Sequence, residues 1–275
     1  MKTSSFFFLI PLALITSCSI KVNDKDSDGD SFSNLFSSSK TINGTGEFQH
    51  KTYNMDFDAI RVSSGIHAEV IKSDVEKIVI SAPSDLLNEV LVEKSGGELK
   101  IHFKPNLNIR NSSSVKATIF AKDFSGLTAS SSAKIVVKDK FTQDKIDVKA
   151  SSSADITGNL EANKFSLQVS SSGSFTGKIW AIDFSGSVSS SGDAEISGSA
   201  TNTTFHASSS GKLDATRFNT KNADLQASSS GDISMQVSEN LSGSASSSGD
   251  INIEKTGSLK TQNIQKSSGG DISIR

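Results

Sequence analysis

The sequence predicts an all-β protein that winds into a stacked β-helix of roughly 19–20 residues per coil. A Ser-Ser-Ser-(Gly/Ala) block recurs with its first serine at positions 130, 151, 170, 189, 208, 228 and 246, and a degraded copy follows at 267. A stacked coil explains this spacing because each turn must return to the same place. Between blocks, apolar and polar residues alternate at a period of two, which excludes helical repeats. A propeller needs units of about 40 residues, twice this spacing.

The first residues have the pattern of an export signal. Lys2 supplies a positive start, residues 6–15 are apolar, and a small-residue junction precedes Cys18. This stretch is too short for a membrane-spanning helix and is typical of a secretory signal peptide. The junction resembles a lipobox, with Ile15 in place of the preferred leucine. We expect residues 1–17 to be a lipoprotein signal peptide and Cys18 to carry the lipid. The alternative is a cysteine that merely lies near a cleavage site.

Three regions follow the signal. Residues 18–44 are polar and rich in aspartate, and we expect a flexible acidic tether. Residues 45–275 are expected to form the β-helix, with a less regular part at 45–125 and regular coils at 126–275. Alternating runs at 60–70, 99–103 and 115–121 predict strands in the less regular part, and only residues 85–94 suggest a short helical turn. Because Cys18 is the only cysteine, no disulfide supports the fold.

The alternation of side chains along a strand predicts a role for the serine blocks. If the alternation of side chains continues through each block, the middle serine shares the inward face with the hydrophobic residues. The inward hydroxyls would then stack about 4.8 Å apart as a hydrogen-bonded ladder. The serines of this expected ladder are Ser131, Ser152, Ser171, Ser190, Ser209, Ser229, Ser247 and Ser268. The following Gly or Ala would be small because the wall bends there.

The serine-glycine-aspartate turns at 189–193, 228–233 and 246–251 resemble the repeated units of the auto-transporter adhesin family with a head GIN domain. Residues 62–67 are similar to the early motif behind that name, with His67 where the family has asparagine. A serine also replaces the first glycine of each unit. The resemblance covers about residues 45–275. It implies a right-handed parallel β-helix that is secreted or surface-anchored, with adhesion named by analogy.

The side chains that could perform chemistry are scattered. The histidines at 50, 67, 102 and 206 form no spaced ligand pair, and no serine has a recognisable base beside it. His206 is expected to face outward, between Phe205 and Ala207. The sequence therefore predicts no catalytic residues and no cofactor. A net charge of −2 gives no reason to expect a nucleic acid partner.

One outward column carries charge. The residue after each Gly or Ala is expected to stack on its equivalents, and the last three are Asp232, Asp250 and Asp271. Carboxylates about 4.8 Å apart repel each other unless they are screened or bridged. They form either a solvated acidic edge or a weak calcium site.

Taken together, the sequence predicts a lipid-anchored outer-membrane protein that faces the periplasm or the exterior and acts as a non-catalytic, adhesin-like binder of a glycan or protein. The alternatives are a structural envelope protein without a dedicated ligand and a polysaccharide-degrading β-helix enzyme. An enzyme usually needs aromatic platforms for sugar rings, and Trp180 and Tyr53 are far apart in sequence. Trp180 is expected to pack at a coil end. The open strands of the last coil suggest self-association through the C-terminal edge.

Overall fold

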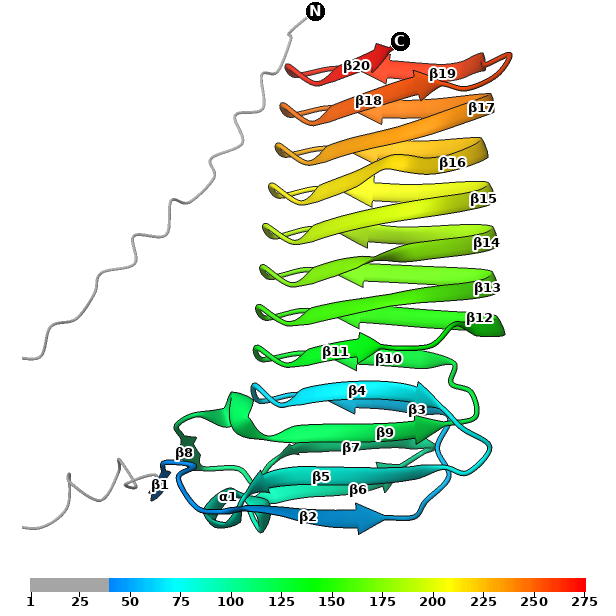
Figure 1. The fold of residues 1–275 in the computed structure, drawn as a ribbon. Coiled ribbons are helices and arrows are strands. Elements are labelled where there is room, and N and C mark those ends of the chain that lie inside the picture. Colours follow the sequence, from blue (N-terminus) through cyan, green and yellow to red (C-terminus); the bar gives the residue numbers. More distant parts are fainter. Residues whose placement is uncertain (1–39) are drawn as a thin grey trace, which may run out of the picture. The chain divides into compact units, whose positions relative to one another are not determined.

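Parallel strands stack in register through most of the computed structural model, which describes residues 40–275 (Figure 1). In the regular part, each strand pairs in parallel with its equivalent in the next coil, and the chain rises as a right-handed helix. The predicted right-handed parallel β-helix is confirmed. Its strands are β10 (Gly126–Ala129), β11 (Lys134–Val137), β12 (Phe141–Ala150), β13 (Asp155–Val169), β14 (Ser174–Val188), β15 (Asp193–Ala207), β16 (Lys212–Ala227), β17 (Asp232–Ala245), β18 (Asp250–Lys255), β19 (Lys260–Lys266) and β20 (Asp271–Ile274).

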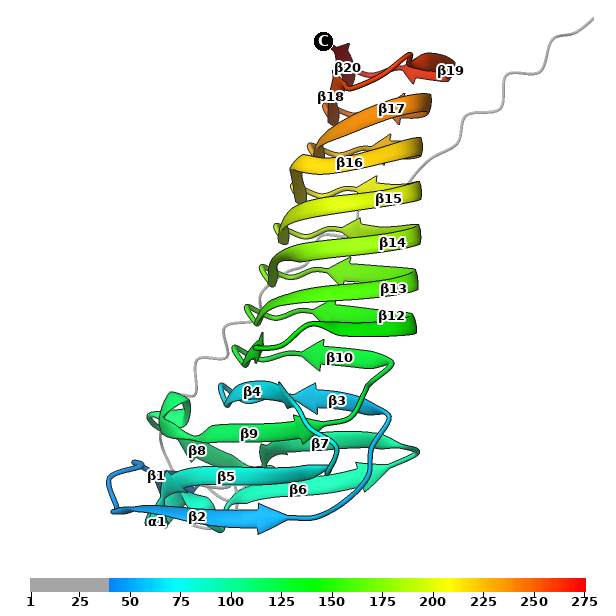
Figure 2. The same cartoon turned by 45° about the vertical axis from the view of Figure 1, so that its right-hand side comes forward.

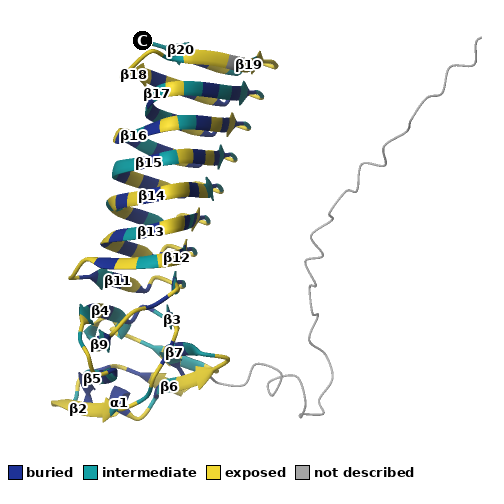
Figure 3. Cartoon of the chain, turned by 90° about the vertical axis from the view of Figure 1, so that its right-hand side faces the viewer, coloured by how far each residue is buried: buried dark blue, intermediate teal, exposed yellow. Residues whose placement is uncertain are grey.

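Each long strand turns a corner and so contributes to two walls of the coil. In β13, buried and exposed residues alternate up to Ala162, two exposed residues follow at Asn163 and Lys164, and the alternation resumes at Phe165. The two consecutive exposed residues mark the corner, because alternation cannot continue where the chain changes direction. We call the part between a serine block and the corner the first wall, and the part between the corner and the next block the second wall. Figure 3 shows buried and exposed positions alternating along both.

Phenylalanines from successive coils fill the interior. The ring centroids of Phe165 and Phe184 lie 6.0 Å apart, and Phe184 lies 5.5 Å from Phe205 and 5.4 Å from Phe218. All four are almost completely buried. Gly186 makes room for the Phe205 ring, since a Cβ atom on Gly186 would lie 2.8 Å from it. The lean apolar composition therefore still produces a continuous core, because nearly every apolar residue between blocks points inward.

The coils of the N-terminal part are stacked out of sequence order. Strands β3 (Ala59–Val62) and β4 (His67–Lys72) form one coil. This coil pairs on one side with β10 and β11 and on the other with β7 (Glu98–Phe103) and β9 (Lys116–Ala121). The chain thus leaves the stack, returns one level away, and then crosses back to begin the regular coils (Figure 2).

Antiparallel strands close this end of the stack. Strand β2 (Phe48–Tyr53) pairs with β5 (Lys77–Pro83), β5 pairs with β9, and β6 (Val90–Ser95) pairs with β7. The short helix α1 (Ser84–Leu87) lies at the start of the segment that was expected to be helical, and β6 occupies the rest. Changing the strand direction and adding a helix covers backbone groups that would otherwise form an open edge.

A pair of short parallel strands and one carboxylate hold the neighbouring loops to these antiparallel strands. Strand β1 (Lys40–Ile42), which lies within the segment expected to be a tether, pairs with β8 (Leu107–Ile109), and a 3-10 turn follows at Ser112–Ser114. The Asp85 carboxylate accepts hydrogen bonds from the backbone N–H groups of residues 44–46. These bonds, led by that of Thr45, hold the pKa of Asp85 below its usual value.

The serine blocks form tight turns, and the inward hydroxyl ladder was wrong. In the block at 189–192, Ser190 and Ser191 have φ values of 50° and 58°, and the Gly192 N–H donates to the Ser189 carbonyl at 2.9 Å. Two consecutive positive φ angles with this hydrogen bond are the pattern of a type I′ turn. Both serines are exposed, and every other block from 130 to 249 has the same pair of positive φ angles. The alternation of side chains along the strand ends where the positive φ angles begin. The alternation therefore predicted the wrong face for the middle serine of each block.

Backbone groups form the ladder instead of hydroxyls. The N–H of the third serine in one block donates to the carbonyl of the middle serine in the next, as from Ser191 to Ser209 at 3.1 Å and from Ser210 to Ser229 at 3.1 Å. The Gly or Ala that ends each block from 130 to 249 is buried, and a Cβ atom on Gly231 would clash with the backbone of Ala207 in the previous coil. The predicted need for a small residue is confirmed, and its cause is this close approach between coils.

No helix in residues 40–275 has the length and apolar character needed to span a membrane. The predicted signal peptide and Cys18 lie outside the described residues.

We predict that Gly231→Ala destabilises the protein by at least about 2 kcal/mol, because the added methyl group meets backbone that cannot move without breaking the stack. The matched control is Ser229→Ala in the same turn, which removes an exposed hydroxyl and should change stability by no more than about 0.5 kcal/mol. Chemical denaturation of both variants provides the measurement. A large loss for Ser229→Ala would instead show that the hydroxyl itself holds the turn together.

Candidate functional site

The first wall carries the charged column that the sequence predicted. Lys134, Asp155, Ser174 and Asp193 lie in register, and Lys212 continues the column. The column then runs through Asp232, Asp250 and Asp271, which occupy adjacent coils. The stacking of the three aspartates is therefore confirmed.

The three aspartates differ in their partners. The Lys266 ammonium donates a 2.8 Å hydrogen bond to Asp271, and this contact holds the pKa of Asp271 below its usual value. Asp250 lies between two like charges, and all three residues are exposed. Within residues 40–275 no group of three or more His, Cys, Asp or Glu side chains has an arrangement that could hold a metal ion. A weak calcium site at this column stays the alternative to a solvated acidic edge.

The histidines are as dispersed as the sequence suggested. His67 lies in register between Lys116 and Lys134, whereas His102 lies beside Glu93 and the Phe103 carbonyl. His206 is on the second wall, in register with Ser187 and Gln226. Its side chain is partly exposed, as the outward parity predicted, although its Nδ1 atom is buried and has no hydrogen-bond partner among the described residues.

The second wall presents a mostly uncharged surface of hydroxyl and amide groups. One outward column of this wall consists of Gln168, Ser187, His206, Gln226, Ser244 and Gln265. At the corner, a chain of side-chain amides links neighbouring coils: Asn202 donates to Asp183 at 2.8 Å, Asn222 to Asn202 at 2.9 Å, and Asn240 to Asn222 at 2.7 Å. Because neighbouring side chains restrain each other, this wall is a rigid, regularly spaced polar surface.

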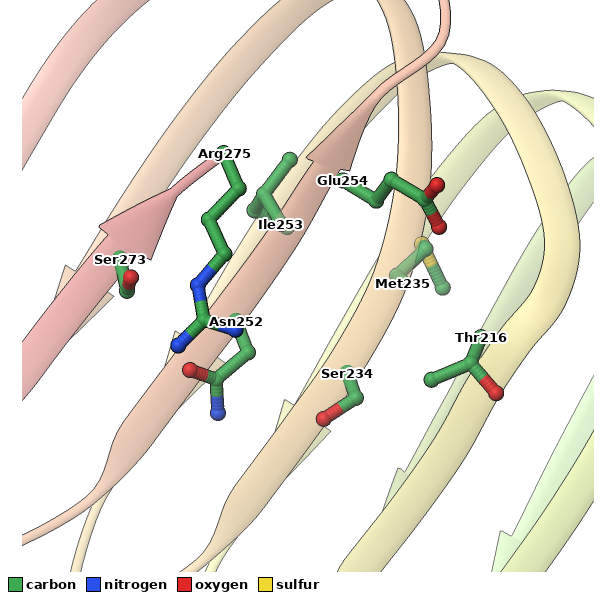
Figure 4. Close-up of a pocket in the computed structure, with 8 residues that line it drawn as sticks. All are labelled: Thr216, Ser234, Met235, Asn252, Ile253, Glu254, Ser273 and Arg275. Carbon is green, nitrogen blue, oxygen red and sulfur yellow. The ribbon is translucent and has the colours of Figure 1, made fainter.

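A hollow with a volume of about 600 Å³ lies on the first wall near β17, β18 and β20. Figure 4 shows Thr216, Ser234, Asn252 and Arg275 around it, with the Glu254 carboxylate at one side. Glu254 accepts a 3.0 Å hydrogen bond from Gln236. It contributes the single carboxylate side chain among the described residues that line the hollow, whereas most glycoside hydrolases need a pair. The arrangement can form hydrogen bonds with a polar ligand.

Trp180 lies two residues before the corner of β14, close to a coil end as expected, but its side chain is exposed instead of packed. It lies in β14 on the first wall, between the buried residues Ile179 and Ala181, and 45% of its surface is exposed. A second hollow adjoins its indole ring and is also lined by Lys140, Asn159, Leu160, Glu161 and Lys178. The sequence did not predict this hollow, because its residues come from different coils and meet only through the register.

Comparison with known proteins identifies the same architecture elsewhere. The sequence profile of the family described as "putative auto-transporter adhesin, head GIN domain" matches residues 56–179 and 157–257. Among curated proteins, none matches the chain.

Solved bacterial structures share the fold at low sequence identity. A protein from Parabacteroides distasonis, described as a putative lipid binding protein, has a TM-score of 0.78 and 22% identity, covering 86% of this chain and 100% of its own. A putative adhesin from Parabacteroides merdae has a TM-score of 0.76 and 17% identity, covering 86% and 99%. A putative adhesin from Bacteroides fragilis has a TM-score of 0.60 and 15% identity, covering 85% and 100%. At these identities the similarity shows the fold alone.

We predict that Asp250→Asn stabilises the protein at low ionic strength by about 0.5 kcal/mol or less, because it removes repulsion from the aspartates above and below. The gain should disappear in 1 M salt, where charges this far apart are screened (the Debye length is about 3 Å). Asp193→Asn is the matched control, since its column neighbours are Ser174 and Lys212.

Thermal melting of both variants with calcium and with a chelator tests the alternative. Calcium should leave the melting temperature of the parent protein unchanged. A calcium-dependent rise that Asp250→Asn abolishes and Asp193→Asn retains would show that the three aspartates bind the ion.

Proposed function

The chain belongs to the family described as "putative auto-transporter adhesin, head GIN domain", and on that premise we propose that it is a cell-envelope lipoprotein that binds an extracellular glycan or protein through the outer walls of its solenoid. The family name and the solved relatives described as adhesins or as a lipid binding protein favour a non-catalytic role. They do not name a ligand for this chain, so the proposal depends on the chemistry of its surface.

The observation that carries the proposal is the register of the outward side chains. Hydroxyl, amide and charged groups repeat from coil to coil at the strand spacing of about 4.8 Å on two walls. A polymeric ligand with repeating polar groups can make the same contact several times on such a surface. Several weak contacts on one rigid support add to a useful affinity.

The same surface gives less support to a degrading enzyme. The hollow at Glu254 lacks a second carboxylate side chain among its described lining residues, and the aspartate column is exposed, so neither site excludes water from a bond to be cleaved.

The binding proposal predicts that residues 40–275, purified without the N-terminal segment, are retained on a glycan array or on immobilised extracellular-matrix proteins with micromolar affinity. Binding that disappears when the captured glycoprotein is deglycosylated assigns the glycan as ligand, and binding that persists assigns the polypeptide. Absence of retention on both surfaces would contradict the proposal and favour a structural envelope role. A loss of viscosity in polysaccharide solutions would instead identify a degrading enzyme.

We also propose that the chain is attached to the outer membrane through a lipid on Cys18 and that its solenoid faces either the periplasm or the exterior. The full-length protein should be recovered with the membrane fraction, and Cys18→Ala should release it into the soluble fraction or leave it unprocessed. Ser17→Ala, which changes the neighbouring residue but keeps the cysteine, is the control. Protease treatment of intact cells distinguishes the two faces. Equal membrane recovery of Cys18→Ala would contradict lipid anchoring.

The last described coil carries a further prediction. Strand β19 pairs with β17, and β20 pairs with β18, so each makes its sheet contacts with one preceding coil. Open strand edges favour pairing with another chain. Self-association through this edge stays a prediction.

A further inference from the structure

Trp180 is an unusual residue on the first wall. It is the sole tryptophan of the chain, and its neighbours on the wall are mostly charged or hydroxylic. Ile182, two positions further along β14, is 42% exposed. An indole has a large apolar face, so an exposed one beside a hollow offers a surface that a ligand can cover and remove from water.

The hollow beside the indole has a volume of about 220 Å³ and spans consecutive coils. Trp180 lies in register with Glu161 of the coil before it and with Ser199 of the coil after it. Lys178 and Asn159 lie in register next to them. The flat ring and the polar groups therefore line the same depression.

The carboxylate in this hollow is held in place. Glu161 forms an ion pair with Lys140 at 2.7 Å and accepts a hydrogen bond from the Thr142 hydroxyl at 3.3 Å. The Lys140 ammonium, through its hydrogen bond, holds the pKa of Glu161 below the usual value. Glu161 is thus an ionised, oriented hydrogen-bond acceptor at neutral pH.

Donors lie beside this acceptor. The Asn159 Oδ1 atom accepts a 3.3 Å hydrogen bond from the backbone N–H of Lys178, which fixes the amide and leaves its NH₂ group for a ligand. The Lys178 ammonium forms no ion pair with any described residue. The hollow therefore combines one apolar face with an acceptor and two donors.

A neighbouring hollow extends the same depression along the strands. Its volume is about 320 Å³, and it shares Asn159 and Lys178 with the first. Thr157, Thr176 and Ser197 add hydroxyl groups to its lining. Gly177 also lines it, and any side chain there would clash with the Gly158 carbonyl. The two adjoining hollows favour a chain of linked rings over a single small molecule.

We propose that this groove, from Trp180 to Ser197, binds a glycan chain, with one pyranose ring stacked on the Trp180 indole. A pyranose has a face of C–H groups that matches an aromatic ring and an edge of hydroxyls that both donate and accept hydrogen bonds. The groove supplies the same combination, whereas an acyl chain would leave the ionised Glu161 and the Lys178 ammonium beside apolar groups, which costs their hydration. The inference rests on the proposed binding function and identifies the ligand class and the wall.

The single tryptophan provides a direct test, because all tryptophan emission of the protein comes from Trp180. Residues 40–275 are titrated with hexasaccharides of glucose, mannose, N-acetylglucosamine and galacturonic acid. We expect at least one of them to shift the emission to shorter wavelength in a saturable manner. Isothermal calorimetry should then show at least tenfold weaker binding of that sugar to Trp180→Ala and partial recovery in Trp180→Phe.

Two further variants separate binding from folding. Asn159→Ala should weaken binding of the same sugar several-fold without changing the melting temperature of the protein. Phe48→Ala removes another exposed aromatic ring, 57% exposed on β2, and should bind as the parent does.

The outcomes distinguish a failure of the proposed Trp180 groove from a failure of the proposed binding function. If a hexasaccharide binds by calorimetry but leaves the Trp180 emission unchanged and binds Trp180→Ala equally well, the groove is wrong and another wall binds glycans. If only proteins bind, the groove is again wrong while the binding function stands. If none of the four sugars and no immobilised protein binds, both proposals fail.

Discussion

Every coil of the regular part, residues 126–275, must lie directly over its neighbour in the stack, and that constraint sets the turn, the core and the surface together. The N–H groups and carbonyls of one rung find their partners in the adjacent rungs, so a coil cannot shift without losing a row of hydrogen bonds. The serine block is one point of close approach, where two residues with positive φ reverse the chain beside the backbone of the previous coil. Positive φ at a residue other than glycine costs about 1 kcal/mol or more, and repeated bonds between turns offset this. No contact among the described residues explains why serine fills these positions instead of asparagine.

The sequence predicted those features that repeat. The spacing of the blocks determined the coil length, and the alternation of apolar residues identified inward positions such as Phe165 and Leu225, which are buried. The alternation failed at the blocks themselves, since a residue such as Ser190 with positive φ no longer follows strand geometry. A sequence-based rule for type I′ turns would have placed the serines outside, but that rule favours asparagine and glycine.

Features that do not repeat could not be predicted from the sequence. Nothing in residues 59–72 shows that their coil lies between β7/β9 and β10/β11, because all of these strands have similar alternation. The groove at Trp180 was hidden for a related reason. Most of its residues come from the successive strands β13, β14 and β15, and only the register brings Glu161 next to the indole. Once the register is accepted, however, a coil length of 19 residues places position 161 beside position 180.

A perfectly regular solenoid has flat walls, so a depression requires a local departure from the repeat. Such departures lie close to the groove. Gly198 in β15, beside Ser199, has a φ of 113° that other residues rarely adopt. The pairing between β15 and β16 also shifts register between Glu195 and Ser197. Bulges of this kind redirect side chains and are common beside binding sites. The repeat provides the rigid support, and its interruption in β15, where the pairing with β16 shifts, lies at the Ser197 side of the concave surface that a ligand would cover.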